Sequence, residues 1–398
     1  MKRKSVLAIV ALVLVFAGTQ TSGYNVVEFP ICTNDANQIN PAINGSIIVW
    51  QDYRNGNWDI YGYDLSTQTE FPICVNSADQ INPDISGNIV VWEDHRYDST
   101  YQGFYCSIYG YKLSTRTEFL VYHMNSHQLD PAIDGNFVVW VEHYPTPWRI
   151  NGYSLSGHTK FLIWGEDESK NTPYPPYIPF YCPAVSGNTV VWWGSGYTST
   201  DNRTMVYDFY NRTITTCNGL YPNISGGIVV YEHHEAPPYG NESYKICYTD
   251  FSKPGKYEPY SHCITYNDPN WCQSNYCNYA EGTDPDISGN IIVWTRWWEF
   301  EHLYGHDIYG YDISTRTWFS ICGISQWHEN PAIDGNIVIW QDHRNGNWDI
   351  YGARLEPFCL EKPEMDFNGD CKVDFADLAI MASSWLECNL VPQSACWE

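Results

Sequence analysis

Residues 331–340 read PAIDGNIVIW and residues 349–352 read DIYG, and versions of these two phrases recur along almost the whole chain. The first phrase has the form Pro-x-(Ile or Val)-x-Gly, followed by an apolar run that ends in an aromatic residue. Its seven prolines are Pro41, Pro83, Pro131, Pro183, Pro222, Pro285 and Pro331, and the aromatic residues nine positions later are Trp50, Trp92, Trp140, Trp192, Tyr231, Trp294 and Trp340. A fixed spacing inside a unit of roughly 40 to 60 residues indicates a repeat architecture.

Each copy contains short β-branched and aromatic segments bounded by Gly, Asn, Asp or Ser, which predicts strands joined by turns. In the first copy we expect strands through 41–43, 47–50, 60–65 and 69–74. Copies three to five carry weaker third strands, centred on Ile150, Val206 and Ile246. Seven units of four antiparallel strands, without a helical period, predict an all-β seven-bladed β-propeller.

The two ends of the repeat region indicate how the ring closes. Residues 27–32 read VEFPIC and nearly match the fourth strand of the first copy, TEFPIC at 69–74. The seventh copy ends near Leu355 without a fourth strand of its own. We therefore expect the N-terminal segment to complete the last blade, which would remove two exposed sheet edges.

The repeats resemble the TolB-like family of propeller repeats. Residues 331–336 (PAIDGN) and 342–351 (DHRNGNWDIY) follow that family's Asp-Gly turn and its Arg-x-Gly-Asn-x-Asp-Ile-Tyr pattern. The resemblance covers residues 24–357; it is strong in copies one, two, six and seven and degenerate in three to five. It implies the fold, but hardly any function, because this fold serves binders, scaffolds and enzymes alike.

The first 23 residues are expected to be a secretory signal peptide. Basic Lys2, Arg3 and Lys4 precede an apolar run at 6–17 and then small polar residues. The run is too short to span a bilayer comfortably, and no later segment is long enough, although an uncleaved anchor remains an alternative. We therefore expect a secreted, extracellular or cell-surface protein with no membrane span after signal removal.

Composition narrows the possible partners. The chain has 46 Asp and Glu against 21 Lys and Arg, so we expect no nucleic-acid partner, because phosphate binding relies on positive charge. Fourteen cysteines in an exported chain indicate disulfides. Cys32, Cys74 and Cys322 end equivalent strands and cannot all pair together; Cys272 and Cys277 are the best local pair. The other connections do not follow from the sequence.

Residues 366–377 (DFNGDCKVDFAD) have the spacing of an EF-hand-type calcium loop. Calcium requires six to eight hard oxygen ligands, and this run can supply most of them. The predicted ligands are Asp366, Asn368, Asp370, the backbone carbonyl of Lys372, Asp374 and Asp377. Apolar residues at helical spacing over 375–386 then predict an amphipathic helix.

Residues 358–398 resemble one half of a type I dockerin, whose loops close with Asp. The resemblance implies docking on a cohesin-like partner and attachment to an extracellular polysaccharide-degrading assembly. Two features depart from the family pattern: only one loop-helix unit is visible, and Cys371 occupies the sixth loop position, where Gly is usual. Cys371 could pair with Cys388 or Cys396. The alternative interpretation is an acidic tail without a bound ion.

Loop lengths indicate which face of the ring binds a ligand. The first-to-second turn is constant, whereas the spacing from the aromatic to the third-strand Ile or Val varies from 10 to 16, and from there to the next proline from 16 to 39. In a four-stranded meander all of this variation falls on one face, where binding usually resides. The candidate ligand-binding aromatics there are Trp164, Tyr174, Tyr177, Tyr266, Trp271, Tyr276, Trp297 and Trp298. Packing of these rings onto the propeller rim is the alternative for each one.

Aromatic rings beside acids and amides suit a sugar-binding surface. Catalysis has weaker support: Glu142, Glu232 and Glu299 are candidate acids, and His143, His233, His234 and His302 are candidate metal ligands. The sequence therefore favours a non-catalytic component of an extracellular polysaccharide-degrading system that binds glycan or protein. A glycoside hydrolase or polysaccharide lyase and a structural cell-surface protein are the alternatives.

Calcium is expected to protect the C-terminal segment from proteolysis. Asp366→Ala with Asp370→Ala removes two of the predicted oxygen ligands, so it should abolish this protection without lowering the melting temperature of the propeller. Limited digestion of the full chain in calcium and in chelator measures the effect. Equal digestion in both conditions would refute the calcium loop.

Overall fold

The structure is a computed structural model that describes residues 23–96, 105–143, 148–165, 180–195, 202–235, 243–252, 262–264, 278–300, 303–323 and 327–357, with Met365, Val373 and Leu378. Residues 1–22 of the predicted signal peptide and the six predicted calcium ligands lie outside the described residues. Among those described, no helix is long and apolar enough to cross a membrane.

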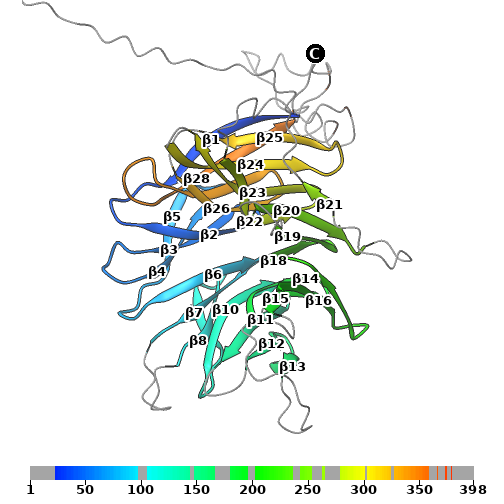
Figure 1. Ribbon diagram of the computed structural model, residues 1–398. Helices are drawn as coiled ribbons and strands as arrows, with labels where there is room; N and C mark the ends of the chain where they lie inside the picture. Colours follow the sequence, from blue (N-terminus) through cyan, green and yellow to red (C-terminus); the bar gives the residue numbers. More distant parts are fainter. Residues whose placement is uncertain are drawn as a thin grey trace, which may run out of the picture.

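The described strands form seven four-stranded antiparallel sheets, which confirms the predicted seven-bladed propeller (Figure 1). Blade 1 contains β2 (Gln38–Asn44), β3 (Ile47–Asp52), β4 (Asp59–Asp64) and β5 (Thr69–Cys74). Blade 2 contains β6 (Gln80–Ser86), β7 (Ile89–Asp94), β8 (Ser107–Lys112) and β9 (Thr117–Tyr122). Blade 3 contains β10 (His127–Asp134), β11 (Phe137–His143), β12 (Arg149–Ser154) and β13 (Thr159–Gly165). The first strand of each blade lies innermost.

The degenerate copies also form complete blades. Blade 4 contains β14 (Phe180–Ser186), β15 (Thr189–Ser195), β16 (Asn202–Asp208) and β17 (Thr213–Cys217). Blade 5 contains β18 (Leu220–Ser225), β19 (Ile228–Glu235), β20 (Ser243–Asp250) and β21 (His262–Ile264). Blade 6 contains β22 (Asn278–Ser288), β23 (Ile291–Phe300), β24 (Leu303–Asp312) and β25 (Thr317–Cys322). The weak third strands predicted around Ile150, Val206 and Ile246 are therefore confirmed.

The N-terminal strand closes the ring, as predicted. Blade 7 has the order β1-β28-β27-β26, made of β26 (His328–Asp334), β27 (Ile337–Asp342), β28 (Asp349–Pro357) and β1 (Tyr24–Cys32). β1 runs antiparallel to β28, with Tyr24 opposite Pro357, and Figure 1 shows the blue and orange strands side by side. Arg344 bonds Glu28 of β1 at 3.0 Å, just as Arg96 bonds Glu118 of its own fourth strand at 2.6 Å. The N-terminal strand thus reproduces the side-chain contacts of an ordinary fourth strand.

The repeated aromatic residue of each second strand belongs to the core. Trp50, Trp92 and Trp340 are fully buried, and each indole N–H donates to the Asp two residues later. The same carboxylates accept from the guanidinium two residues further on, as in the 2.6 Å bond from Arg344 to Asp342. The repeated Asp and Arg therefore make local turn contacts, as the sequence predicted. Burial of a large ring in every blade supplies much of the apolar stabilisation.

The repeated proline lies at a β-bulge of each inner strand. In β2 the pairing with β3 shifts between Ile39 and Ala42, so Pro41 is not required to donate to the ladder. The residue before each proline adopts a left-handed conformation, with φ between 45° and 52°. These seven residues, which we call the mouth ring, are Asn40, Asn82, Asp130, Cys182, Tyr221, Asp284 and Asn330.

A closed series of hydrogen bonds joins neighbouring blades at the opposite end of the inner strands. The backbone N–H of the turn glycine in each blade donates to the side-chain oxygen of the last inner-strand residue in the preceding blade, at 2.5 to 3.2 Å. The donors are Gly45, Gly87, Gly135, Gly187, Gly226, Gly289 and Gly335, and their acceptors are Asp334, Asn44, Ser86, Asp134, Ser186, Ser225 and Ser288. The bond from Gly45 to Asp334 completes the circle between blades 1 and 7.

The cysteines at the ends of equivalent fourth strands are not paired with one another. Cys32, Cys74 and Cys322 are buried, and each sulfur accepts from an Arg of the next blade. A disulfide joins Cys247 of β20 to Cys263 of β21, a pair that the sequence did not single out. Cys272 and Cys277, the predicted local pair, lie outside the described residues.

Deletion of residues 24–32 should destabilise the whole ring, because β28 would lose its partner strand β1 and become an open edge. We expect a lower melting temperature, and a synthetic peptide of residues 24–32 added in excess should restore part of it. Thermal unfolding of the mature chain, followed by circular dichroism, measures both effects. An unchanged melting temperature would mean that β1 contributes little to closure.

Candidate functional site

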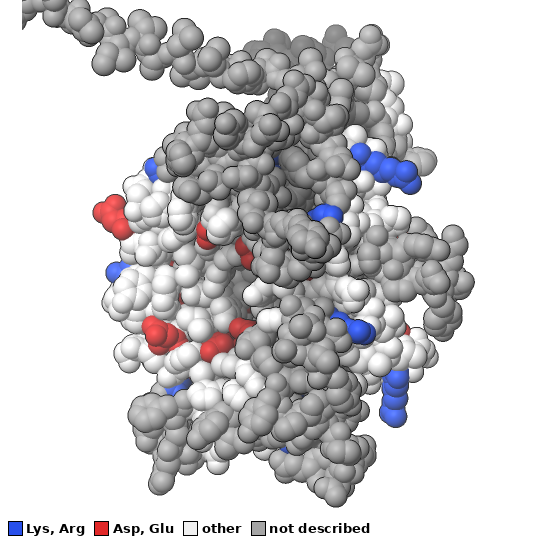
Figure 2. All heavy atoms as spheres, viewed as in Figure 1, with Lys and Arg blue, Asp and Glu red and all other residues white. Residues whose placement is uncertain are grey.

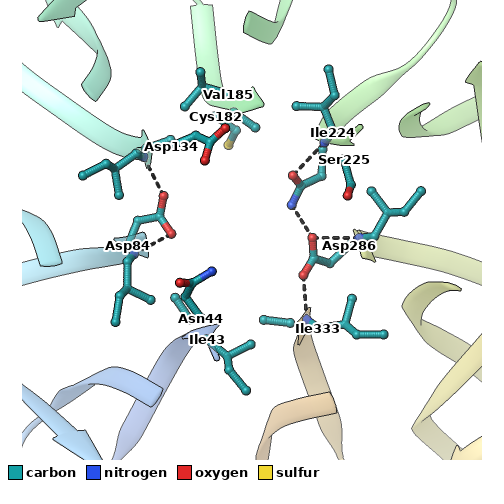
Figure 3. A pocket seen from close by; sticks show the side chains of 18 of the residues that line it. Ile43, Asn44, Asp84, Asp134, Cys182, Val185, Ile224, Ser225, Asp286 and Ile333 are labelled. Atoms are coloured by element: carbon teal, nitrogen blue, oxygen red, sulfur yellow. Dashed lines mark hydrogen bonds between the residues drawn. The ribbon is translucent and has the colours of Figure 1, made fainter. Parts of the chain in front are cut away.

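The face that carries the variable loops surrounds one end of a central channel. Second-to-third loops and the connections between blades end there, because the inner strands of all seven blades run in the same direction. The channel has a volume of about 580 Å³ and is lined by the inner strands β2, β6, β10, β14, β18, β22 and β26. Figure 3 shows side chains from these strands pointing into the open centre.

On one side of the mouth ring, the amide side chains of neighbouring blades form hydrogen bonds with one another. The Nδ2 group of Asn330 donates to Asn40 Oδ1 at 3.0 Å, Asn40 donates to Asn82 at 3.3 Å, and Asn82 donates to Asp130 Oδ1 at 3.0 Å. Each donor is therefore used by its neighbour, and the series ends on a carboxylate. The polar groups on this side mainly hold the blades together.

The other side of the mouth ring has different chemistry. Going round from Asp130, it presents the thiol of Cys182, the phenol of Tyr221 and the carboxyl of Asp284. Behind Asp284, the backbone N–H of that residue donates to Glu232 Oε1 at 2.8 Å. Tyr221 lies 5.5 Å from the Trp193 ring. Blades 3 to 6 thus bring acids, a thiol and aromatic rings to one half of the opening.

Carboxyl groups along the channel hold their protons more tightly than usual. Burial raises the pKa of Asp84 to about 6 and that of Asp286 to about 7, although both also accept backbone N–H bonds that lower it. Figure 3 shows these two side chains across the opening from each other. Burial and the charge of Glu93 raise the pKa of Asp130 to about 6. The lumen is therefore only partly charged near neutral pH.

An aromatic cluster lies on the rim of the mouth between blades 6 and 7. His306, 4% exposed, stacks on Trp297 at 4.2 Å between ring centroids and on Trp327 at 4.9 Å, with interplanar angles of 27° and 28°. The two tryptophans are 47% and 49% exposed, so about half of each indole faces solvent. His306 Nδ1 lies 2.7 Å from Glu329 Oε1. We call Trp297, His306, Trp327 and Glu329 the rim cluster.

Electrostatics link the rim cluster to the channel. Burial raises the pKa of Asp284, the charge of Glu329 raises it further, and His306 opposes this. Next to His306, the Arg296 guanidinium bonds Asp307 at 2.8 Å and lies 4.0 Å from the Tyr309 ring. Exposed apolar faces, an imidazole and acids therefore occur together at one edge of the mouth.

Of the predicted ligand-binding aromatics, Trp297 lies in the rim cluster. The neighbouring Trp298 is half-buried and lies over Gly305, and Trp164 packs against the Trp192 ring at 6.2 Å in the seam between blades 3 and 4. Tyr174, Tyr177, Tyr266, Trp271 and Tyr276 lie outside the described residues. The sequence reasoning missed Trp327 and His306. Trp327 could have been noticed, since aligned copies carry Asn37, Asp79 and His127 at its position.

The candidate acids have structural partners. Glu142 is buried and accepts from Lys160 at 2.6 Å and from Asn151 at 2.7 Å, while Glu232 holds a backbone amide of the next blade. The side chain of Glu299 lies outside the described part. Among the candidate metal ligands, His143 stacks on Trp148 at 3.8 Å and His233 bonds the carbonyl of Asn218. His143 and His233 thus lie in different blades, and the side chains of His234 and His302 are not described.

The surface carries both signs of charge. Figure 2 shows acidic side chains of the described part mainly in the left half of the visible face, and basic side chains mainly in the right half and along the margin. This distribution does not form one electrostatic patch in that view.

No protein-family model and no curated protein matches the sequence. The chain is similar in structure to the propeller domain of the Trilobed protease from Pyrococcus furiosus (TM-score 0.55, 11% identity, covering 82% of this chain and 98% of that one). It is also similar to oligogalacturonate lyase from Vibrio parahaemolyticus (TM-score 0.55, 12% identity, 86% and 98%). The similarity to TolB from Acinetobacter baumannii is weaker (TM-score 0.45, 12% identity, covering 73% of this chain and 67% of that one). At these identities the first two similarities show the seven-bladed propeller fold alone.

Removing the raised-pKa acids should change how stability depends on pH. A carboxyl whose folded pKa is raised contributes most below its unfolded pKa near 3.8, and this contribution is lost as pH rises through 6 to 7. Asp84→Ala with Asp286→Ala introduces the residue found in four other copies. From pH 5 to pH 8 the native chain should lose about 4 kcal/mol more stability than this variant, roughly one third of it from Asp84 and two thirds from Asp286.

Urea unfolding at the two pH values measures this difference. Asp64→Ala is the matched control, because hydrogen bonds from Ser66 lower the pKa of Asp64 and it stays ionised throughout this range. The control should keep the native pH dependence. Identical pH dependence in the channel variant and the native chain would show that the channel acids titrate normally.

Proposed function

We propose that the protein is a non-catalytic carbohydrate-binding component that holds a glycan at the channel mouth. The observation that carries this proposal is the rim cluster, where two half-exposed indoles flank His306 beside Glu329 and Asp284. Monomeric proteins seldom leave adjacent large rings in water without a binding role.

The geometry suits a sugar ring. Trp297 and Trp327 lie nearly parallel to His306, so each indole has one face covered by the imidazole and offers flat apolar surface to solvent. Pyranose rings present apolar C–H faces that stack on such surfaces, while their hydroxyl groups need hydrogen-bond partners. Glu329 and Asp284 supply acceptors at the same edge. Glu329 is held in place by His306 and by Gln341 Nε2 at 3.2 Å, which limits the entropy lost on binding.

Binding is favoured over catalysis by the state of the acids. Glycoside hydrolysis needs two facing carboxyl groups at a controlled separation. Glu142 is neutralised by Lys160, and Glu232 is committed to the backbone of Asp284. These groups are therefore occupied in holding the blades, whereas the rim indoles are available to a ligand.

The proposal includes where the protein works. We infer that residues 1–23 direct export and that residues 366–377 bind calcium in a dockerin-like module, which would attach the ring through a cohesin-like partner to a polysaccharide-degrading system. The support is the register of the six oxygen ligands and the amphipathic pattern after them. A glycan-binding ring would hold such an assembly on its substrate.

Retention on immobilised polysaccharides tests the proposal. Trp297→Ala and Trp327→Ala each remove a stacking surface worth about 1 to 2 kcal/mol, so each should weaken retention by about 5- to 30-fold. Tyr210→Ala is the matched control, because Tyr210 is 80% exposed in the turn between β16 and β17 on the opposite face of the ring. Retention should be unchanged in this variant.

The same assay distinguishes a binder from an enzyme. Supernatants are analysed for reducing ends and for unsaturated ends after long incubation with each polysaccharide. Retention without product is expected. Release of product would show that the protein is an enzyme and would overturn the proposal. Equal retention of the rim variants and the native chain would show that the glycan does not bind at the rim cluster.

A further inference from the structure

Three potential metal ligands of blade 2 lie together at the seam between blades 2 and 3, and a fourth, His127 of blade 3, contacts one of them, Cys106. Cys106 Sγ lies 3.6 Å from His95 Nε2 and 3.3 Å from His127 Nδ1, and His95 Nε2 lies 2.7 Å from Glu93 Oε1. Ligand atoms of Glu93, His95 and Cys106 all lie within 4.8 Å of one another. We call these four residues the blade 2 cluster. It is separate from the rim cluster, which lies between blades 6 and 7.

The other copies show what the repeat normally places at these four positions. In blade 1 they are Gln51, Tyr53, Trp58 and Asp79, and in blade 7 they are Gln341, His343, Trp348 and Asn37. There the tryptophan contacts the preceding aromatic ring at 5.0 Å, as in the pairs Tyr53–Trp58 and His343–Trp348. Blade 2 therefore replaces an indole by a thiol, and adds an acid and an imidazole at two more positions.

The backbone of blade 2 keeps the geometry of the repeat despite these changes. Trp58 N–H donates to Asp79 Oδ1 at 2.9 Å and Trp348 N–H donates to Asn37 Oδ1 at 3.0 Å. In blade 2 the corresponding N–H of Cys106 points to His127 Nδ1 at 3.5 Å. That nitrogen has a single in-plane lone pair, so zinc binding by His127 Nδ1 would replace this long contact with the amide.

We propose that Glu93, His95, Cys106 and His127 form a zinc site. In a tetrahedral zinc site, Zn–S bonds of about 2.3 Å and Zn–N bonds of about 2.0 Å place sulfur and nitrogen about 3.5 Å apart. The two sulfur–nitrogen distances in the blade 2 cluster bracket this value. The pair of His95 and Glu93 would have to separate slightly, because a direct hydrogen bond holds them now.

The ligand set selects the class of metal. Thiolate and imidazole favour Zn²⁺ over Ca²⁺, Mg²⁺ or Mn²⁺, which prefer oxygen ligands. Four protein ligands indicate a closed, structural site. On binding, the Cys106 S–H bond breaks, its proton goes to solvent, and the sulfur lone pair forms the bond to the ion. Three ligands come from blade 2 and His127 comes from β10 of blade 3, so the ion would fasten two blades together.

Burial and access are also suitable. Cys106 and Glu93 are 4% and 3% exposed, while the side chain of His95 is 38% exposed and leaves a path from solvent. Glu93 Oε2 accepts the backbone N–H of Asp130 at 3.2 Å, which orients the carboxylate from the channel side. Such support of a ligand by a second partner is typical of protein metal sites.

A second group of potential ligands, Cys322, His328 and Asp342, is not suited to bind a metal. Asp342 already accepts from Trp340, Arg344 and His328, and the Arg344 guanidinium reaches Cys322 Sγ at 3.4 Å. A permanent cation therefore occupies the place of the metal. The lowered pKa of Asp342, caused by these hydrogen bonds and the neighbouring charges, agrees with this arrangement. The two groups provide an internal comparison for experiment.

Metal titration of the full mature chain tests the proposal. The protein is stripped with chelator and returned to calcium, which saturates any calcium site, before titration with Zn²⁺ against a chromophoric chelator. One equivalent of Zn²⁺ is expected. Cys106→Ser and His127→Asp should each weaken binding at least about 100-fold, whereas Cys322→Ser should leave it unchanged. Co²⁺ should give a thiolate-to-metal charge-transfer band that disappears in Cys106→Ser.

A reversion variant guards against failure to fold. Cys106→Trp with His127→Asp installs the residues of blade 1, Trp58 and Asp79, at both positions. This variant should unfold cooperatively but show no rise in melting temperature with Zn²⁺, whereas the native chain should gain stability. No zinc binding by the native chain, or an unchanged charge-transfer band in Cys106→Ser, would overturn the proposal.

Discussion

Closure of the ring is the constraint on which every other feature of this structure depends. Each inner strand is held to its neighbours by a backbone amide that donates to a side chain of the previous blade, and this series has no beginning or end. The pairing of β1 with β28 makes that possible, because it gives blade 7 the same four strands as the others. The channel and its mouth exist only in the closed ring, so the candidate sites depend on the N-terminal strand.

The regular copies serve as a reference against which functional residues can be recognised. Contacts found in several blades, such as Trp92 with Asp94 and Arg96, build the turn and the seam between blades. Departures from the pattern are grouped in space rather than scattered. The residues of the rim cluster differ from the repeat pattern at the seam between blades 6 and 7, and those of the blade 2 cluster differ from it at the seam between blades 2 and 3. One scaffold thus carries two chemically different regions: blade 2 keeps the strand lengths of blade 1, whereas blade 6 extends β22, β23 and β24 to 11, 10 and 10 residues.

The sequence predicted the fold because its spacing is fixed by strand geometry: a proline at the bulge and an aromatic nine residues later recur in every blade. It also predicted closure by residues 24–32 and the turn role of Asp52 and Arg54. It could not predict the rim cluster, since Trp297, His306 and Trp327 come from three separate elements that meet only in the folded ring. The repetition of histidine at 95 and 343 indicates a turn role for both, and the replacement of the repeat's tryptophan by Cys106 distinguishes blade 2.

The left-handed backbone before each proline limits which residues can occupy the channel mouth. Asn and Asp tolerate this conformation better than other non-glycine residues, so the shape of the bulge alone accounts for five members of the mouth ring. The presence of Asn or Asp at these five positions therefore does not by itself indicate a ligand. Cys182 and Tyr221 adopt the same conformation without that tolerance, at a cost of about 1 to 3 kcal/mol each. The backbone therefore restricts residue identity at these positions, and blades 4 and 5 are where backbone geometry does not account for the side chain.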